Sequence, residues 1–150
     1  MNIYVGADHR GFKFKKKIIQ FLEQQGHSAF DMGAYREDPP CDYPQIAYKV
    51  GTQVTKSKNA RGILLCMTGI GQMIAANKVP GIYAALCCSK AAARFSREHN
   101  NSNVLVLSAK FVSRKDLFSI IKIWLKTEFA GGRHQRRVNQ IKKMERKFRG

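Results

Sequence analysis

Short apolar runs alternate with segments of helical periodicity along this chain of 150 residues. Five of the runs have the length and composition of strands, at residues 2–7, 27–33, 61–67, 81–88 and 102–109. The third run, "RGILLCM", is almost wholly apolar, as strands buried on both faces of a parallel sheet are. Repeated β–α units join parallel strands by right-handed crossovers, which place helices on both faces. The sequence therefore predicts a Rossmann-like three-layer α/β/α sandwich with a five-stranded parallel sheet.

Apolar residues between these runs recur at the spacing of amphipathic helices. The two clearest stripes consist of Phe14, Ile18, Phe21 and Leu22, and of Leu117, Ile120, Ile121, Trp124 and Leu125. Residues 35–44 hold three of the four prolines and are predicted to form a loop. Neither an internal repeat nor a low-complexity linker interrupts the pattern, so residues 1–150 are expected to form a single domain.

The chain is strongly basic, with 27 Lys and Arg residues against 10 Asp and Glu and a net charge of +17. The basic residues gather in "KFKKK" (13–17) and in the tail "RHQRRVNQIKKMERKFR" (133–149). Such a balance is typical of a protein with an anionic substrate, of one with a nucleic-acid partner, or of any protein from a basic proteome. The sequence has neither an apolar run of about 18 residues nor the apolar core of a secretory signal, so we expect a cytoplasmic protein without a membrane partner.

The four cysteines, Cys41, Cys66, Cys87 and Cys88, form no CxxC pair and no zinc ligand set. In a reducing compartment they are expected to be free thiols, and the sequence predicts no metal site. Cysteines in strands are most often structural. Cys66 differs because a glycine-rich turn and a predicted helix follow it, and the amides of a helix N-terminus lower the pKa of a thiol. Cys66 is therefore either a core residue or a reactive thiol.

Candidate acid and base groups stand near the ends of the predicted strands. Ligands of open parallel sheets bind beyond the carboxyl ends of the strands. Asp8 and His9 follow the first run, Cys66 and Thr68 stand at the end of the third, and His99 lies in a loop before the fifth. We expect a carboxylate, a thiol and an imidazole to converge on one crevice. A structural interpretation remains open for two of them, Asp8 as a helix N-cap and His99 as a hydrogen-bonding loop residue.

The turn "TGIGQ" (68–72) places backbone amides next to Cys66. Gly69 and Gly71 allow an anion to come close to the main chain. The turn lacks the Lys-Ser/Thr of a nucleotide P-loop and the third glycine of a dinucleotide fingerprint. Its pattern fits an enediolate or a phosphate.

Six motifs span residues 6–138 in the order "GADHRG", "DYP", "CMTGIG", "AANK", "SREHNNSNVLVL" and "GGRHQRRV". Together they resemble the B-type ribose-5-phosphate isomerases, which share a family with galactose-6-phosphate and allose-6-phosphate isomerases. The resemblance implies an aldose–ketose isomerase of the non-oxidative pentose phosphate pathway that interconverts ribose 5-phosphate and ribulose 5-phosphate. It also implies a cis-enediolate and no metal or cofactor. A hexose 6-phosphate, of allose or galactose, is the alternative substrate.

The resemblance implies four catalytic residues. Cys66 matches the base that moves a proton between C1 and C2 of the sugar. Thr68 is similarly placed to help protons move between the two oxygens. Asp8 and His99 match the pair that opens the furanose ring.

Further residues are implied to contact the sugar phosphate. The substrate-binding set is His9, Tyr43, Met67, Gly69, Gly71, Gln72, Asn100 and Lys110. Backbone N–H groups of residues 67–72 would hold the enediolate oxygen. Some relatives use a glutamate base at the position of Gln72, which cannot act as a base here. The phosphate is assigned to Arg133 and Arg137, which lie one helical turn apart, together with His134.

Members of the family are homodimers with the active site at the subunit interface, so the resemblance implies a homodimer, or a tetramer. Val138, Ile141, Met144 and Phe148 form an apolar stripe along the basic tail, which predicts a helix with a docking face. We expect this C-terminal helix to pack on the partner subunit, and His99 to serve the Cys66 of the other copy.

Three positions depart from the family pattern. Met67 replaces a glycine, Lys110 replaces an arginine, and Tyr83 replaces a common arginine. Lysine contacts a phosphate as a point charge and not bidentately, so these departures bear on substrate identity and phosphate affinity. The alternative from another class of protein function is a basic nucleic-acid-binding protein on an inactive isomerase fold. No nucleic-acid motif accompanies the charge, so a sugar phosphate and not nucleic acid is the expected partner.

Overall fold

The computed structural model describes residues 1–148 of the chain. These residues form five strands and six α-helices, with a short 3₁₀ helix at His9–Gly11. The strands are β1 (Asn2–Ala7), β2 (Ser28–Asp31), β3 (Arg61–Cys66), β4 (Ala84–Leu86) and β5 (Val104–Ser108). The helices are α1 (Phe12–Gln24), α2 (Tyr43–Val54), α3 (Ile70–Ala76), α4 (Lys90–Glu98), α5 (Arg114–Lys126) and α6 (Gly132–Phe148). Each predicted strand is present, although β2, β4 and β5 are shorter than expected.

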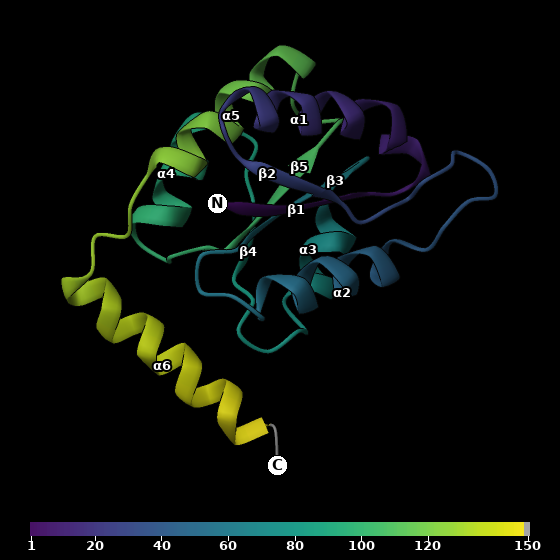
Figure 1. The fold of residues 1–150 in the computed structure, drawn as a ribbon. Helices are drawn as coiled ribbons and strands as arrows, with labels where there is room; N and C mark the ends of the chain where they lie inside the picture. Colours follow the sequence, from purple (N-terminus) through teal and green to yellow (C-terminus); the bar gives the residue numbers. More distant parts are fainter. Residues whose placement is uncertain (149–150) are drawn as a thin grey trace.

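The strands form one parallel sheet in the order β2-β1-β3-β5-β4, which confirms the predicted architecture. β3 is central, and its Leu64 is aligned with Gly6 of β1 and Val106 of β5. Helices α1, α4 and α5 cover one face, and α2 and α3 cover the other (Figure 1). Because β1 and β3 are neighbours, the residues that follow them emerge side by side at the carboxyl edge of the sheet.

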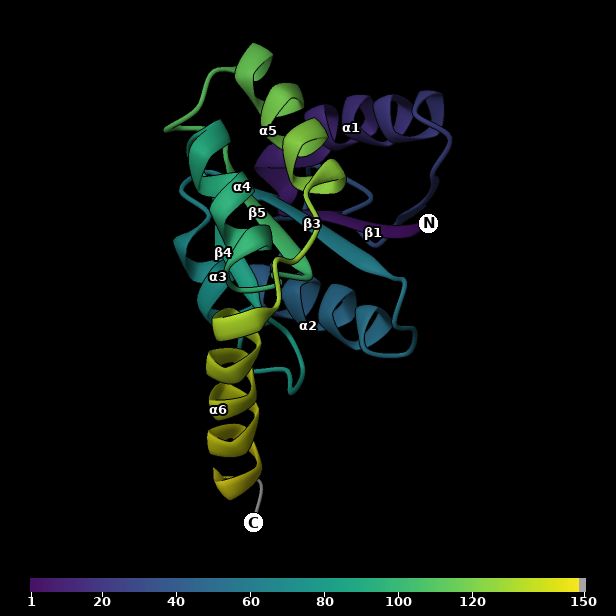
Figure 2. The same ribbon diagram turned by 90° about the vertical axis from the view of Figure 1, so that its left-hand side faces the viewer.

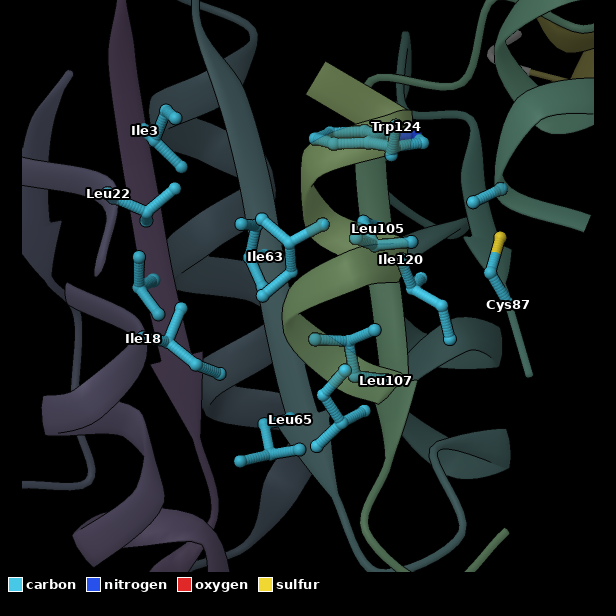
Figure 3. Packing of buried hydrophobic residues seen from close by; sticks show 14 of the residues in the cluster. Ile3, Ile18, Leu22, Ile63, Leu65, Cys87, Leu105, Leu107, Ile120 and Trp124 are labelled. Carbon is cyan, nitrogen blue, oxygen red and sulfur yellow. The ribbon is translucent and has the colours of Figure 1, made fainter. Parts of the chain in front are cut away.

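The side chains of β3 alternate between two hydrophobic cores. Ile63 and Leu65 belong to a cluster on one face that also contains Trp124 of α5 (Figure 3). Leu64 packs with Val50 of α2 on the other. All five side chains are completely buried, and burial of each stabilises the fold by roughly 1.5–3 kcal/mol. Burial on both faces explains the continuous apolar run of the third strand.

The chain turns sharply just before β4, which shortens this strand relative to the predicted run. Gly81 has a φ of +82°. The Asn103 side chain accepts a hydrogen bond from the Tyr83 amide and donates one to the Gly81 carbonyl, each at 2.8 Å. These side-chain bonds replace ladder bonds between strands, so pairing with β5 begins at Ala84.

Helix α6 leaves the body of the molecule and runs past the loop between α3 and β4 (Figure 1, Figure 2). Of its described residues, Val138 is buried against its own chain. Ile141, Met144 and Phe148 are 43%, 60% and 91% exposed. The predicted C-terminal helix is confirmed, and it keeps an apolar side that its own chain does not cover.

Candidate active site

Cys66 and Asp8 meet at the carboxyl edge, where β3 and β1 end side by side. The Cys66 thiol donates a hydrogen bond from Sγ to Asp8 Oδ2 at 3.1 Å. The other carboxylate oxygen of Asp8 accepts a bond from the Gly11 amide at 3.0 Å and caps the 3₁₀ helix. Asp8 is therefore a helix N-cap, as its structural interpretation predicts. It also contacts the Cys66 thiol, as the expected convergence of a carboxylate and a thiol predicts.

The pKa of the Cys66 thiol is raised above its ordinary value. Burial is the largest cause, followed by the hydrogen bond to Asp8 and the negative charge of that carboxylate. Hydrogen bonds from the backbone of Gly69 and Met67 lower the pKa by a smaller amount. The prediction that the turn lowers the thiol pKa is wrong for the net shift, because desolvation and the carboxylate outweigh the amides.

The turn between β3 and α3 requires glycine at its tightest point. Gly69 has a φ of +80°, and a Cβ at this position would lie 2.7 Å from Leu86 Cδ1. Both the left-handed backbone and the close packing exclude a side chain. Thr68 Oγ1 accepts a hydrogen bond from the Ile70 amide at 3.4 Å. The turn therefore keeps the Thr68 hydroxyl and the adjacent amides next to Cys66.

Tyr43, Lys110 and His9 lie at the same edge. A Cβ on Gly71 would lie 2.5 Å from Tyr43 Cζ, so the tyrosine ring packs on the first turn of α3. The Lys110 amide donates a hydrogen bond to the Met67 carbonyl at 2.9 Å. His9 follows β1 directly, and its Nδ1 is buried without a hydrogen-bond partner among residues 1–148. The structure thus brings these predicted substrate contacts together around the thiol.

Gln72 lies in the first turn of α3 but does not present its side chain to the edge. The side chain is completely buried, and neither amide atom has a hydrogen-bond partner in the described part of the chain. In this conformation the backbone of Gln72, and not its amide, is the group available for the predicted contact with substrate.

The other predicted residues lie at the opposite edge of the sheet. His99 caps the C-terminus of α4 and precedes β5, so it stands at the amino end of that strand. Cys66 is aligned with Ser108 at the carboxyl end of β5. At 3.3 Å per residue, the five residues of β5 place the two edges roughly 17 Å apart. Within one chain His99 and Cys66 therefore lie apart, because residues before and after a parallel strand emerge at opposite edges. That His99 serves the Cys66 of another copy stays a prediction.

A second group of predicted residues gathers around His99. Its ring stacks on that of His134, with centroids 4.3 Å apart and an interplanar angle of 8°. Asn100 follows in the same loop, and Arg133 and Arg137 are exposed on α6. The pKa of His134 is lowered by desolvation and then by the neighbouring charges of His99, Arg133 and Arg137. These neighbours favour the neutral form of the His134 imidazole.

Lys15 supports the site and was missed in the sequence, where it belongs to the basic cluster "KFKKK". Its side chain is completely buried, forms an ion pair with Asp31 and donates a hydrogen bond to the Ala34 carbonyl. These bonds fix the segment after β2, which pairs with the end of β1 next to Asp8. The spacing of the apolar residues could have revealed its burial, because Lys15 lies three residues before Ile18 and so falls on the buried side of α1.

Two further findings concern residues 1–148. No cluster of three or more His, Cys, Asp or Glu side chains in this range could hold a metal ion, and no helix in it is both long and apolar enough to cross a bilayer. All four cysteines are free thiols, as predicted.

A parallel α/β sheet that joins a thiol, a carboxylate and a glycine turn at its carboxyl edge has the parts of an acid–base enzyme. The chain belongs to the ribose/galactose isomerase family, whose family model matches residues 3–141. This match confirms the resemblance that the motifs indicate.

Individual relatives match the chain over nearly its whole length. It is 43% identical to ribose-5-phosphate isomerase B of Clostridium thermocellum, with a TM-score of 0.95 and 99% of both chains covered. The crystal structure of ribose-5-phosphate isomerase B from Mycoplasma genitalium, with ribulose-5-phosphate bound, is 40% identical with a TM-score of 0.93, over 97% of this chain and 96% of that one. The ribose-5-phosphate isomerase B of Mycobacterium tuberculosis is 37% identical over 147 residues, which are 97% of this chain and 91% of that protein.

Proposed function

We propose that this chain is an aldose–ketose isomerase that interconverts ribose 5-phosphate and ribulose 5-phosphate, and that it acts as a cytoplasmic homodimer. The observation that carries the proposal is the Cys66 thiol, which contacts the Asp8 carboxylate at 3.1 Å beside the glycine turn. The Mycoplasma genitalium relative, whose structure holds ribulose-5-phosphate, is 40% identical to this chain. That identity supports a pentose phosphate as substrate.

Cys66 acts as the base in its thiolate form. The thiolate removes the proton from C2 of the open-chain aldose, the C2–H electrons form the C1=C2 double bond, and the carbonyl oxygen on C1 becomes negative. The O2 hydroxyl proton passes to O1 with help from the Thr68 hydroxyl, and the thiol returns its proton to C1. The product carries its carbonyl on C2. General base catalysis typically contributes about 10²–10⁴-fold to such a rate.

The backbone N–H groups of the turn stabilise the enediolate oxygen, and one such donor contributes about 10²–10³-fold. The Met67 carbonyl accepts hydrogen bonds from Ser108 Oγ at 2.8 Å and from the Lys110 amide at 2.9 Å. These bonds hold the main chain of the turn in place even though Met67 stands where relatives have glycine. The Met67 side chain is exposed, so it projects away from the core that supports the turn.

Ionisation of Cys66 near neutral pH requires positive charge, because burial and Asp8 raise the pKa of the thiol. Within one chain, Arg133 and Arg137 lie at the edge opposite Cys66. A second copy of the chain supplies these arginines and its His99 to the first. The arginines bind the substrate phosphate and lower the thiol pKa, while His99 of that copy and Asp8 open the furanose ring.

The geometry of α6 supports this exchange. At about 100° per residue, Arg133, Arg137, Ile141 and Met144 fall on one side of the helix, and Val138 faces the helix's own chain. Burial of the apolar residues on a second copy would carry both arginines to the carboxyl edge of that copy. The proposed dimer thus removes the separation between the two groups of predicted site residues.

The test is a steady-state assay of ribulose 5-phosphate formation by the purified protein. Cys66→Ala is expected to lower kcat by at least about 100-fold, since it removes the base, whereas Cys88→Ala, at an exposed thiol, should retain the wild-type rate. A parallel comparison with allose 6-phosphate and galactose 6-phosphate tests the sugar. A higher kcat/KM for either hexose phosphate would contradict the pentose assignment, and an unchanged rate in Cys66→Ala would contradict the role of Cys66.

A further inference from the structure

A cavity lies at the amino edge of the sheet, between the starts of β3, β4 and β5 and the side of α6. Its volume is about 790 Å³, within the range of small-molecule binding sites. The polar side chains that define this amino-edge cavity include Lys58, Arg61, Tyr83, Arg97 and Lys142. None of these belongs to the proposed isomerase site, so the cavity requires its own explanation.

Helix α6 runs past the loop between α3 and β4 (Figure 2). Its residues Lys142 and Glu145 line one side of the amino-edge cavity. The Glu145 carboxylate on α6 accepts a hydrogen bond from the Gly81 amide of that loop at 2.7 Å. Glu145 is the one acidic residue among those that line the cavity, against four Lys and Arg residues. The lining therefore carries a net positive charge, and its single carboxylate is already engaged by the main chain.

Arg61 is held rigidly in the wall of the cavity. Its Nη1 donates hydrogen bonds to the carbonyls of Trp124 and Leu125 at 3.2 and 3.1 Å, and its guanidinium stacks on the Trp124 ring at 5.2 Å. No carboxylate among residues 1–148 forms an ion pair with it, and its Nε and Nη2 have no hydrogen-bond partner there. Arg61 thus presents a positioned and uncompensated cation.

Arg97 adds a second such cation and is only 6% exposed. Its Nε and Nη1 donate to the carbonyls of Thr127 and Ser102 and to Asn101 Oδ1. It also lacks an ion pair in the described chain, and its Nη2 remains unbonded there. Burial and then the charge of Arg61 lower the pKa of Arg97 to about 10. Two guanidinium groups that repel each other beside a cavity form a receptor for an anion.

Tyr83 contributes an unsatisfied donor. Its hydroxyl oxygen is buried and has no hydrogen-bond partner among the described residues, and the pKa of the phenol is raised by burial and by Glu145. A buried hydroxyl without a partner costs about 1–3 kcal/mol, and an oxygen atom of a ligand would remove that cost.

We propose that the amino-edge cavity binds a small phosphorylated metabolite, whose phosphate lies between Arg61 and Arg97 and accepts a hydrogen bond from Tyr83. Lys58 and Lys142, at the rim, contact further negative charge on the same ligand. The size of the cavity and the small number of cations that line it favour a compact di- or polyanion over a nucleic-acid strand. The site is separate from the Cys66 edge and does not depend on the isomerase assignment.

Isothermal titration calorimetry on the full-length native protein tests the site, with inorganic pyrophosphate and ADP as separate probes at physiological ionic strength. Lys58→Glu/Lys142→Glu changes two exposed side chains and is expected to weaken binding by at least tenfold. Lys17→Glu/Lys122→Glu makes the same change in net charge at exposed positions on α1 and α5 and should leave affinity unchanged. Tyr83→Phe removes a single hydroxyl and should weaken binding by severalfold.

A further variant separates this site from the proposed substrate phosphate group. Arg137→Ala should keep the pyrophosphate affinity of the wild type. Loss of pyrophosphate binding in Arg137→Ala, with retention in Lys58→Glu/Lys142→Glu, would place the anion at the isomerase site and overturn the proposal. It would also be overturned if neither probe bound the wild type, or if a single-stranded RNA oligonucleotide bound through Lys58 and Lys142 while both probes failed. Binding of either probe that depends on Lys58, Lys142 and Tyr83 supports it.

Discussion

The Cys66 thiol donates a hydrogen bond to Asp8 Oδ2 at 3.1 Å, and the negative charge of that carboxylate favours the neutral thiol. This contact joins the ends of two neighbouring parallel strands, β1 and β3. The arrangement explains why the pKa of the thiol is raised and not lowered. The proposed base therefore needs nearby positive charge to ionise, and in the proposed dimer the arginines of a second copy provide it.

Replacement of Asp8 by asparagine is expected to lower the pKa of Cys66. The substitution removes the negative charge that disfavours the thiolate, although burial still opposes ionisation. The rate of alkylation by iodoacetamide, followed from pH 6 to 10, reports the thiolate fraction, and Cys66→Ala provides the background from the other thiols. The alkylation profile should shift to lower pH while isomerase activity falls, because ring opening loses its acid–base group. An unshifted profile would contradict the influence of Asp8.

Mixtures of two inactive variants test the shared site. Unfolding and refolding Cys66→Ala together with Arg137→Ala should restore about one quarter of the wild-type activity, since half of the dimers are then mixed and each mixed dimer holds one intact site. The matched control mixes Cys66→Ala with Asp8→Asn. Both residues lie at the same edge of one chain, so no mixed dimer has an intact site and no activity should return. Absence of recovery in the first mixture would show that each chain acts alone.

Replacement of Gly69 by alanine should destabilise the fold and abolish activity. The left-handed backbone costs about 1–2 kcal/mol for an L-residue, and the contact at 2.7 Å with Leu86 adds about 1–3 kcal/mol of overpacking. Gly26→Ala is the control, because Gly26 has a φ of +82° but nothing within 4 Å of its Cβ position. Urea denaturation should show a larger loss of unfolding free energy for Gly69→Ala than for Gly26→Ala. Equal losses would exclude a contribution from the contact with Leu86.

Replacement of Lys15 by methionine should lower the free energy of unfolding by about 2 kcal/mol or more. It leaves the Asp31 carboxylate and the Ala34 carbonyl without their partner, and loss of one member of a buried pair is costly. The partial exposure of Asp31 reduces that cost. Lys16→Met, at an exposed position on the same helix, should stay within about 0.5 kcal/mol of the wild type. Similar denaturation midpoints for the two variants would refute the buried role of Lys15.

Much of the fold and half of the candidate site follow from local patterns. The apolar run that ends at Cys66 predicts a doubly buried strand. Cys66 ends β3 and Asp8 directly follows β1, so their meeting at one edge is a direct consequence of parallel pairing. The stripe in α1 also contained Lys15, but its charge placed it with the solvated cluster. The ion pair that buries it depends on Asp31, which is 16 residues away.

The sequence by itself determined the succession of strands and helices and named the candidate reacting groups, because hydrophobic periodicity and turn chemistry act over a few residues. The tertiary structure alone decided three other properties: the direction of the pKa shift of Cys66, the burial of Lys15, and the separation of His99 from Cys66 within one chain. Each depends on distances between segments that are remote in sequence. Such distances are set by the order of strands in the sheet, and by which edge of the sheet each loop occupies.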